Sequence, residues 1–275
     1  MRDYLGTVCA EGAVIPAKLV AFEKALADLH GRFSALVKGA DQDGTLDADK
    51  KKTLMETATE LADAEKPYEI DRARLLADLD SYRMQYTVAT ALPPGEEPGL
   101  WETNQALHAA RRKFHPIAEA IRGLIKQVDL LYKLASRVAD LGSELAAAEP
   151  IADVYDRRAA GRLVKQLDEE RKAAVEQLKH VAYFHRQVVW LQERFPKADL
   201  EAVPGLGRLV DKQEIEAADW SLTPGRYVGV APPEEDEDFD FEAALRDIHT
   251  ELADLNQEAV ELAAKIQANF EELGM

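Results

Sequence analysis

The sequence predicts an all-α protein: long antiparallel helices in a bundle or coiled coil, a short irregular segment, and a C-terminal heptad helix. Apolar residues recur at spacings of three and four over most of the 275 positions, which is the helical period. Aromatic residues make up only 7%, while Ala, Leu, Glu, Asp and Lys dominate, a composition typical of long helices. Nothing in the chain requires a βαβ unit.

The first hundred residues predict three helices, at 14–38, 45–64 and 68–92. The polar stretch 39–49 predicts a loop between the first two. Lys66 and Pro67 should break the second helix from the third, because proline lacks the backbone N–H that a helix interior needs. Three prolines and two glycines between Leu92 and Gly99 predict a further loop.

Two longer helices are expected next, at 101–148 and 152–195, the latter ending at Pro196. Pro116 should kink or split the first of them. Glycine and proline then become frequent, with a short helix at 212–218 and a short strand or a turn within 222–231. We therefore expect three parts: a long-helix domain at 1–198, an irregular segment at 199–233, and an acidic linker with a closing helix at 234–275.

The closing helix carries a coiled-coil seam. Its apolar positions alternate steps of three and four, and one helix cannot bury such a seam alone. The partner is either another helix of this chain or a helix of another chain. The seam positions are Leu245, Ile248, Leu252, Leu255, Ala259, Leu262, Ile266, Asn269 and Leu273.

Basic residues recur along one face of each of the two longer helices. Such stripes could follow a DNA backbone, where Lys and Arg neutralise phosphates without reading sequence. The alternative is a solvated helix surface of mixed charge. The stripe in 152–195 consists of Arg158, Lys165, Lys172, Lys179 and Arg186, and the stripe in 101–148 includes Arg122, Lys126, Lys133 and Arg137.

The overall composition restricts the class of protein. A net charge of −17 excludes binding of nucleic acid by the overall field, so any DNA contact needs a local basic face. Cys9 is the only cysteine, which excludes a disulfide framework and a cysteine zinc site and favours a reducing cytoplasm. No apolar run approaches membrane-spanning length and no signal-peptide pattern is present, so no membrane partner is expected.

No catalytic or metal site is predicted. The stretch from Asp41 resembles a calcium loop but has Leu46 where the turn glycine belongs and Lys52 where the bidentate glutamate belongs. His180 and His185 lack metal-ligand spacing and are expected on helix surfaces.

The sequence Trp-Ser-Leu-Thr-Pro-Gly-Arg-Tyr-Val-Gly at 220–229 precedes an acidic run at 234–242 and the closing heptads. In this order, the region 203–275 resembles the C-terminal end of the modification subunit of type I restriction–modification systems. Members of that family are adenine-N6 DNA methyltransferases that act with a DNA-reading specificity subunit. The resemblance implies that the closing helix packs with helices of the specificity subunit. It also makes Arg226 a candidate for a phosphate or inter-subunit contact and Tyr227 a packing residue.

The methyl-transfer machinery itself is missing from this chain. Such enzymes need a glycine-rich pocket for S-adenosylmethionine and a polar–Pro–Pro–aromatic loop around the flipped adenine. The pairs Pro93-Pro94 and Pro232-Pro233 lack the flanking polar and aromatic residues. No cofactor is therefore expected in this chain, and S-adenosylmethionine only in a separate catalytic domain. The expected role is to dock on the specificity subunit and help hold DNA; the alternative is a structural coiled-coil or homodimerisation protein unrelated to DNA.

Overall fold

A computed structural model describes residues 1–42, 48–90, 103–148 and 155–231, together with the single positions 245, 252 and 259. All regular structure in these residues is helical, and a lone bridge between Val203 and Gly207 is the only strand-like pairing among them. The all-α prediction is confirmed. The chain divides into two compact units, Met1–Leu200 and Glu201–Met275.

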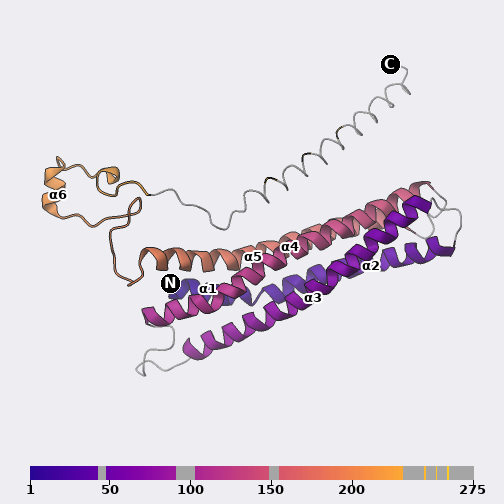
Figure 1. Ribbon diagram of the computed structural model, residues 1–275, viewed down its shortest axis with the longest axis horizontal. Coiled ribbons are helices and arrows are strands. Elements are labelled where there is room, and N and C mark those ends of the chain that lie inside the picture. The colour runs from indigo at the N-terminus through magenta and orange to yellow at the C-terminus, as the bar shows by residue number, and fades with distance from the viewer. Residues whose placement is uncertain are drawn as a thin grey trace, which may run out of the picture. The chain divides into compact units, whose positions relative to one another are not determined.

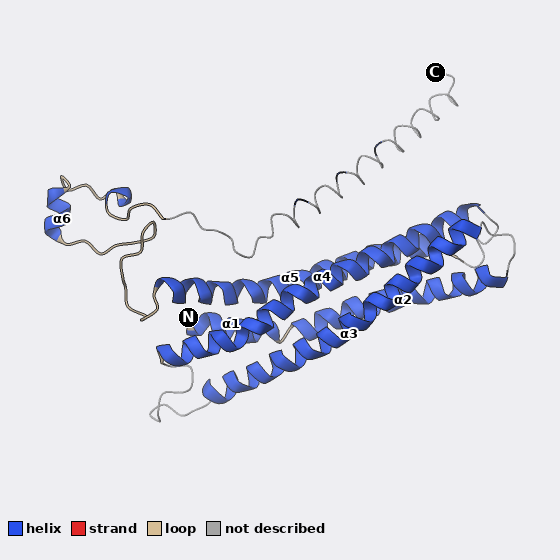
Figure 2. Cartoon of the chain, viewed as in Figure 1, coloured by secondary structure: helices blue, strands red, loops and turns tan. Residues whose placement is uncertain are grey.

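The first unit is a bundle of long helices that run side by side (Figures 1 and 2). Helix α4 packs between α3 and α5, and α5 packs on α1 and α2. Buried apolar residues at helical spacing form one continuous core, with Leu124, Val128 and Leu131 of α4 inside it. The helices are α1 (Arg2–Gly12), α2 (Ile15–Gln42), α3 (Ala48–Thr90), α4 (Asn104–Ala148) and α5 (Arg157–Arg194).

The predicted break at Pro67 is wrong, because α3 is continuous and contains this proline. A proline inside a helix costs about 3 kcal/mol. Leu61, six residues before it, and Tyr68, immediately after it, are both buried in the core, and their burial outweighs that local cost. Helix α4 likewise runs through Pro116, so the expectation of a split helix there is wrong.

Helix α1 was not predicted, because Gly6 and Gly12 weaken its local helical signal. Both glycines allow close approach to α3. A Cβ atom on Gly6 would lie 2.6 Å from the hydroxyl of Tyr86, and one on Gly12 would lie 3.4 Å from Leu79. Tertiary packing therefore favours glycine where helix propensity does not.

The remaining boundaries shift by a few residues. Helix α2 extends to Gln42 and therefore occupies part of the predicted loop at 39–49, of which residues 43–47 lie outside the described residues. The loop predicted at 92–99 lies outside them as well. Helix α5 begins at Arg157 instead of 152, because the Asp156 side chain accepts the backbone N–H groups of Arg158 and Ala159 and caps it.

One segment, Arg2–Phe33, is long and apolar enough to cross a membrane by length and composition alone, which the sequence analysis did not anticipate. It spans α1 and most of α2. Its side chains Leu5, Leu19 and Phe22 are fully buried in the bundle. Core packing therefore buries part of the apolar content of this segment.

The second unit has a small irregular fold between 201 and 231. Helix α6 (Lys212–Ala217) confirms the predicted short helix and begins at a capping box formed by Asp211 and Glu214. The 222–231 stretch contains a 3₁₀ turn, Pro224–Arg226, instead of a strand. Gly205 has a φ of +77° and donates its backbone N–H to the carbonyl of Val228, which ties the two ends of the segment together. Of the predicted closing helix, only positions 245, 252 and 259 are described, and each is helical.

Candidate nucleic-acid interface

Helices α4 and α5 lie antiparallel in a register fixed by specific contacts. The Tyr155 hydroxyl donates to the carbonyl of Ala139 at 3.1 Å near one end. In the middle, Arg171 Nη1 lies 2.7 Å from Asp129 Oδ1. At the other end, the Asn104 amide donates to the carbonyl of Pro196 at 2.7 Å. This register decides which side chains of the two helices share a face.

All nine helical basic candidates are exposed, and they lie on two helices that pack against each other. Asp129 and Arg171 pair across the α4–α5 seam. Near the same seam, Arg111, His115 and Arg122 of α4 act electrostatically on His185 of α5. We call this surface the α4–α5 basic face. Its candidates are Arg122, Lys126, Lys133 and Arg137 of α4, with Arg158, Lys165, Lys172, Lys179 and Arg186 of α5.

The charge of these two helices opposes that of the whole chain. Helix α4 contains seven Lys or Arg against four Asp or Glu, and α5 contains nine against five. The full chain carries −17. A positive field is therefore local to this part of the bundle, which is the condition that DNA contact requires in an acidic protein.

Part of the basic face is already neutralised. Lys172 Nζ lies 2.6 Å from Asp168 Oδ2, and this contact, with Arg171 beside it, lowers the pKa of Asp168. His115 lies 3.4 Å from Glu119. Within the described residues, Lys165, Lys179 and Arg186 form no ion pair and remain open to an anionic ligand.

The prediction that His185 lies on the helix surface is wrong. Its ring is buried between Phe114, at a centroid distance of 5.1 Å, and His115, at 6.2 Å. Burial, together with the charges of His115, Arg111 and Arg122, lowers the pKa of His185 to about 4, although a hydrogen bond to the Arg111 backbone opposes the change. The ring is therefore neutral at pH 7 and acts as a packing residue beneath the basic face.

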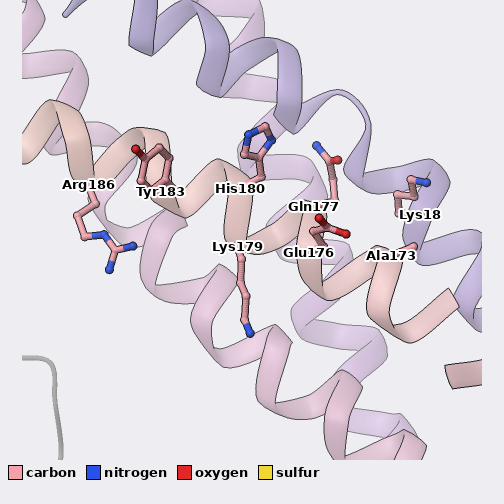
Figure 3. Close-up of a pocket in the computed structure, with 8 residues that line it drawn as sticks. All are labelled: Lys18, Ala173, Glu176, Gln177, Lys179, His180, Tyr183 and Arg186. Carbon is pink, nitrogen blue, oxygen red and sulfur yellow. The ribbon is translucent and has the colours of Figure 1, made fainter. Parts of the chain in front are cut away.

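A shallow pocket of about 500 Å³ lies over α5 (Figure 3). Lys179 and Arg186 extend to one side of the helix, while His180 and Gln177 extend to the other, toward α1. Sequence reasoning identified the two cations but missed Tyr183 between them. The signal was present, because Tyr183 stands four residues after Lys179 and three before Arg186, which places all three on one helical face.

Neither a metal site nor a reactive thiol is found in the described part of the chain. Among these residues, no three His, Cys, Asp or Glu side chains are placed to hold a metal ion. Cys9 is buried in the core, and this burial raises its pKa to about 12, so it is not a reactive thiol. The stretch that resembles a calcium loop falls largely outside the described residues.

In the second unit, the two motif residues hold their own turn. The Arg226 guanidinium donates to the carbonyl of Ala218 at 3.2 Å, and the Tyr227 hydroxyl donates to the carbonyl of Ser221. Arg226 is otherwise exposed, and Trp220 and Leu222 nearby expose most of their surface. The motif therefore presents apolar side chains and one cation around a fixed turn.

The closing seam is described only at Leu245, Leu252 and Ala259, all exposed. Leu245 and Leu252 expose more than half of their surface. Leucines at heptad positions are usually buried once they pack against a partner helix. The other seam candidates lie outside the described residues: Ile248, Leu255, Leu262, Ile266, Asn269 and Leu273.

Comparison with known proteins found no matching family model, no similar curated protein and no similar solved structure.

Proposed function

We propose that this chain is a non-catalytic module of a DNA-methylation complex, the C-terminal region of a type I modification subunit. In this role it holds the DNA backbone along the α4–α5 basic face and docks on the specificity subunit through its closing helix. The observation that carries the DNA role is a pair of exposed basic stripes on two adjacent helices of an acidic protein. The docking role rests on the motif at 220–229 and the closing heptads.

The physical basis of the DNA role is counterion release. Each Lys or Arg that approaches a phosphate displaces condensed cations from the duplex. The stripe on α5 extends from Arg158 to Arg186, or roughly 42 Å at 1.5 Å per residue. This length exceeds one turn of B-form DNA, which is about 34 Å. The face is therefore long enough to meet the backbone at more than one point.

Charge reversal on this face tests the DNA role. The full chain with Lys165→Glu and Lys179→Glu should bind a duplex of arbitrary sequence at least tenfold more weakly than the unmodified chain at low salt. The matched control reverses Lys52 and Arg74 of α3, which are equally exposed and change the net charge by the same amount. Equal weakening by both pairs would mean that only net charge matters, and would reject the proposed face.

The exposed leucines of the closing helix test the docking role. Leu245→Glu with Leu252→Glu places charges on the seam without shortening the chain, and should weaken binding to the specificity subunit at least tenfold. Deletion of 243–275 should abolish it. A specificity subunit that binds these variants as tightly as the unmodified chain would reject docking through this helix.

The same exposed leucines favour one alternative, a structural coiled-coil protein that forms a homodimer and does not contact DNA. It predicts a concentration-dependent dimer in sedimentation that the two leucine substitutions abolish, and no duplex binding by either protein. Dimerisation together with duplex binding would leave the DNA role in place and assign the seam to a second copy of this chain.

A further inference from the structure

Four rings gather on the outer surface where α5 packs on α1. Phe184 occupies the centre, with ring centroids 4.9 Å from His180, 5.4 Å from Tyr183 and 5.9 Å from Tyr4. Phe184 is half-buried, whereas Tyr183 is 45% exposed. The contact between Tyr183 and Phe184 is edge-on, with an interplanar angle of 77°, so it orients the tyrosine ring without covering it.

Two cations flank Tyr183 on α5. Lys179 lies four residues before it and Arg186 three residues after it, while Lys18 of α2 lies at the other end of the pocket, near Ala173 (Figure 3). Lys179 and Arg186 form no ion pair within the described residues. The acidic side chain that lines the pocket is Glu176. Glu11 of α1 contacts His180 at 3.4 Å and Gln177 at 2.8 Å. These contacts hold the side of the pocket that faces α1.

We propose that this pocket binds an unpaired nucleotide of single-stranded nucleic acid, with the base stacked on Tyr183 and the neighbouring phosphates paired with Lys179 and Arg186. An exposed aromatic ring flanked by cations is the arrangement by which proteins hold single strands without reading their sequence. A duplex cannot use it, because each base in a duplex is covered by its neighbours in the stack. The inference rests on the proposed function for nucleic-acid binding and adds a preference for unpaired segments at one end of the α4–α5 basic face.

The test uses the full chain and a single strand of about 12 nucleotides that contains one 2-aminopurine, a fluorescent base whose emission falls when it stacks. A matched blunt duplex serves as the second ligand. Tyr183→Ala should weaken single-strand binding at least fivefold, since base–aromatic stacking contributes about 1–3 kcal/mol per base. It should also reduce the quenching of 2-aminopurine, while duplex binding stays within twofold. Tyr183→Phe keeps the ring and should retain both single-strand affinity and quenching.

Tyr4→Ala is the matched control, because Tyr4 is the other exposed tyrosine on Phe184 but lies outside the pocket. It should leave single-strand binding unchanged, and circular dichroism should show the same helix content for all variants. Unchanged single-strand binding by Tyr183→Ala would overturn the inference, as would equal losses for single strand and duplex. If duplex binding persists in these cases, the proposed function stands; if neither ligand binds the unmodified chain at low salt, both fail.

Discussion

Arg171 of α5 and Asp129 of α4 form an ion pair at 2.7 Å, although 42 residues separate them in the chain. The same guanidinium binds Asp168 at 2.8 Å and lies 4.7 Å above the Tyr132 ring. Arg171 therefore joins the two helices that carry the basic stripes. This contact helps to fix the register of the two helices that form the α4–α5 basic face.

Removal of this contact should destabilise the bundle. Arg171→Ala leaves Asp129 and Asp168 without their shared partner, and we expect a loss of about 1–3 kcal/mol in the free energy of unfolding, measured in urea. A double-mutant cycle with Asp129→Ala should give a coupling energy of about 1 kcal/mol. Arg74→Ala, which removes an exposed pair with Asp78 at 4.0 Å, should cost less than about 0.5 kcal/mol. Strictly additive effects of the Arg171 and Asp129 substitutions would contradict the structural role of this pair.

His185 should make stability depend on pH. Its pKa in the folded protein is about 4, against an ordinary value of 6.5, because burial disfavours the charged ring. Between these values the unfolded chain binds a proton that the folded chain does not, so stability is complete above pH 6.5 and falls as the pH drops toward 4. The loss attributable to His185 at pH 4.5 should be about 2–3 kcal/mol.

His185→Leu should remove this part of the pH dependence, while the carboxylates that also titrate in this range remain in both proteins. The comparison is between urea unfolding of the two proteins at pH 7 and at pH 4.5. An identical loss of stability in both would show that His185 titrates normally in the folded state.

Gly205 should be far less replaceable than Gly207. Gly205 has a positive φ, and an added Cβ would lie 2.8 Å from the backbone nitrogen of Ala231 and closer still to its side chain. Gly207, two residues on, has no atom within 4 Å of such a Cβ. Gly205→Ala should separate the 203–207 turn from 228–231 and increase hydrogen exchange of the Gly205 amide, which donates to Val228. Gly207→Ala should not, and equal protection in both variants would contradict the described turn.

Pro67→Ala should stabilise α3. The substitution restores a helical N–H and removes the ring contact with the preceding turn, at an exposed position that tertiary contacts do not require. We expect a gain of about 1–3 kcal/mol in urea unfolding. Destabilisation would indicate that a bend at Pro67 is needed for Leu61 and Tyr68 to reach the core together.

Helices with a regular local pattern could be predicted from the sequence, whereas features that depend on long-range packing could not. Helical periodicity predicted α2, α4 and α5 because their apolar spacing repeats over several turns. Periodicity did not predict α1, where Gly6 allows close packing against Tyr86. It also wrongly predicted that α3 ends at Pro67, where the burial of residues on both sides outweighs the local cost of the proline.

The candidate interface shows the same division. The exposure of each stripe could be predicted from one helix at a time. The packing of the two helices against each other could not, because it depends on contacts between residues that are distant in sequence, such as Arg171 and Asp129. The burial of His185 and the aromatic cluster around Phe184 likewise arise only when α1, α4 and α5 pack together.

The central claim is that DNA lies along the α4–α5 basic face, and lysine footprinting tests it most directly. The full chain is acetylated with and without a duplex of about 20 base pairs, which is longer than the stripe, and modification is quantified at each lysine. The account predicts that the duplex protects Lys126, Lys133, Lys165 and Lys179, while Lys52 and Lys66 of α3, equally exposed, react as before. Protection of the α3 lysines to the same degree, or no protection at any lysine under low salt, would contradict it.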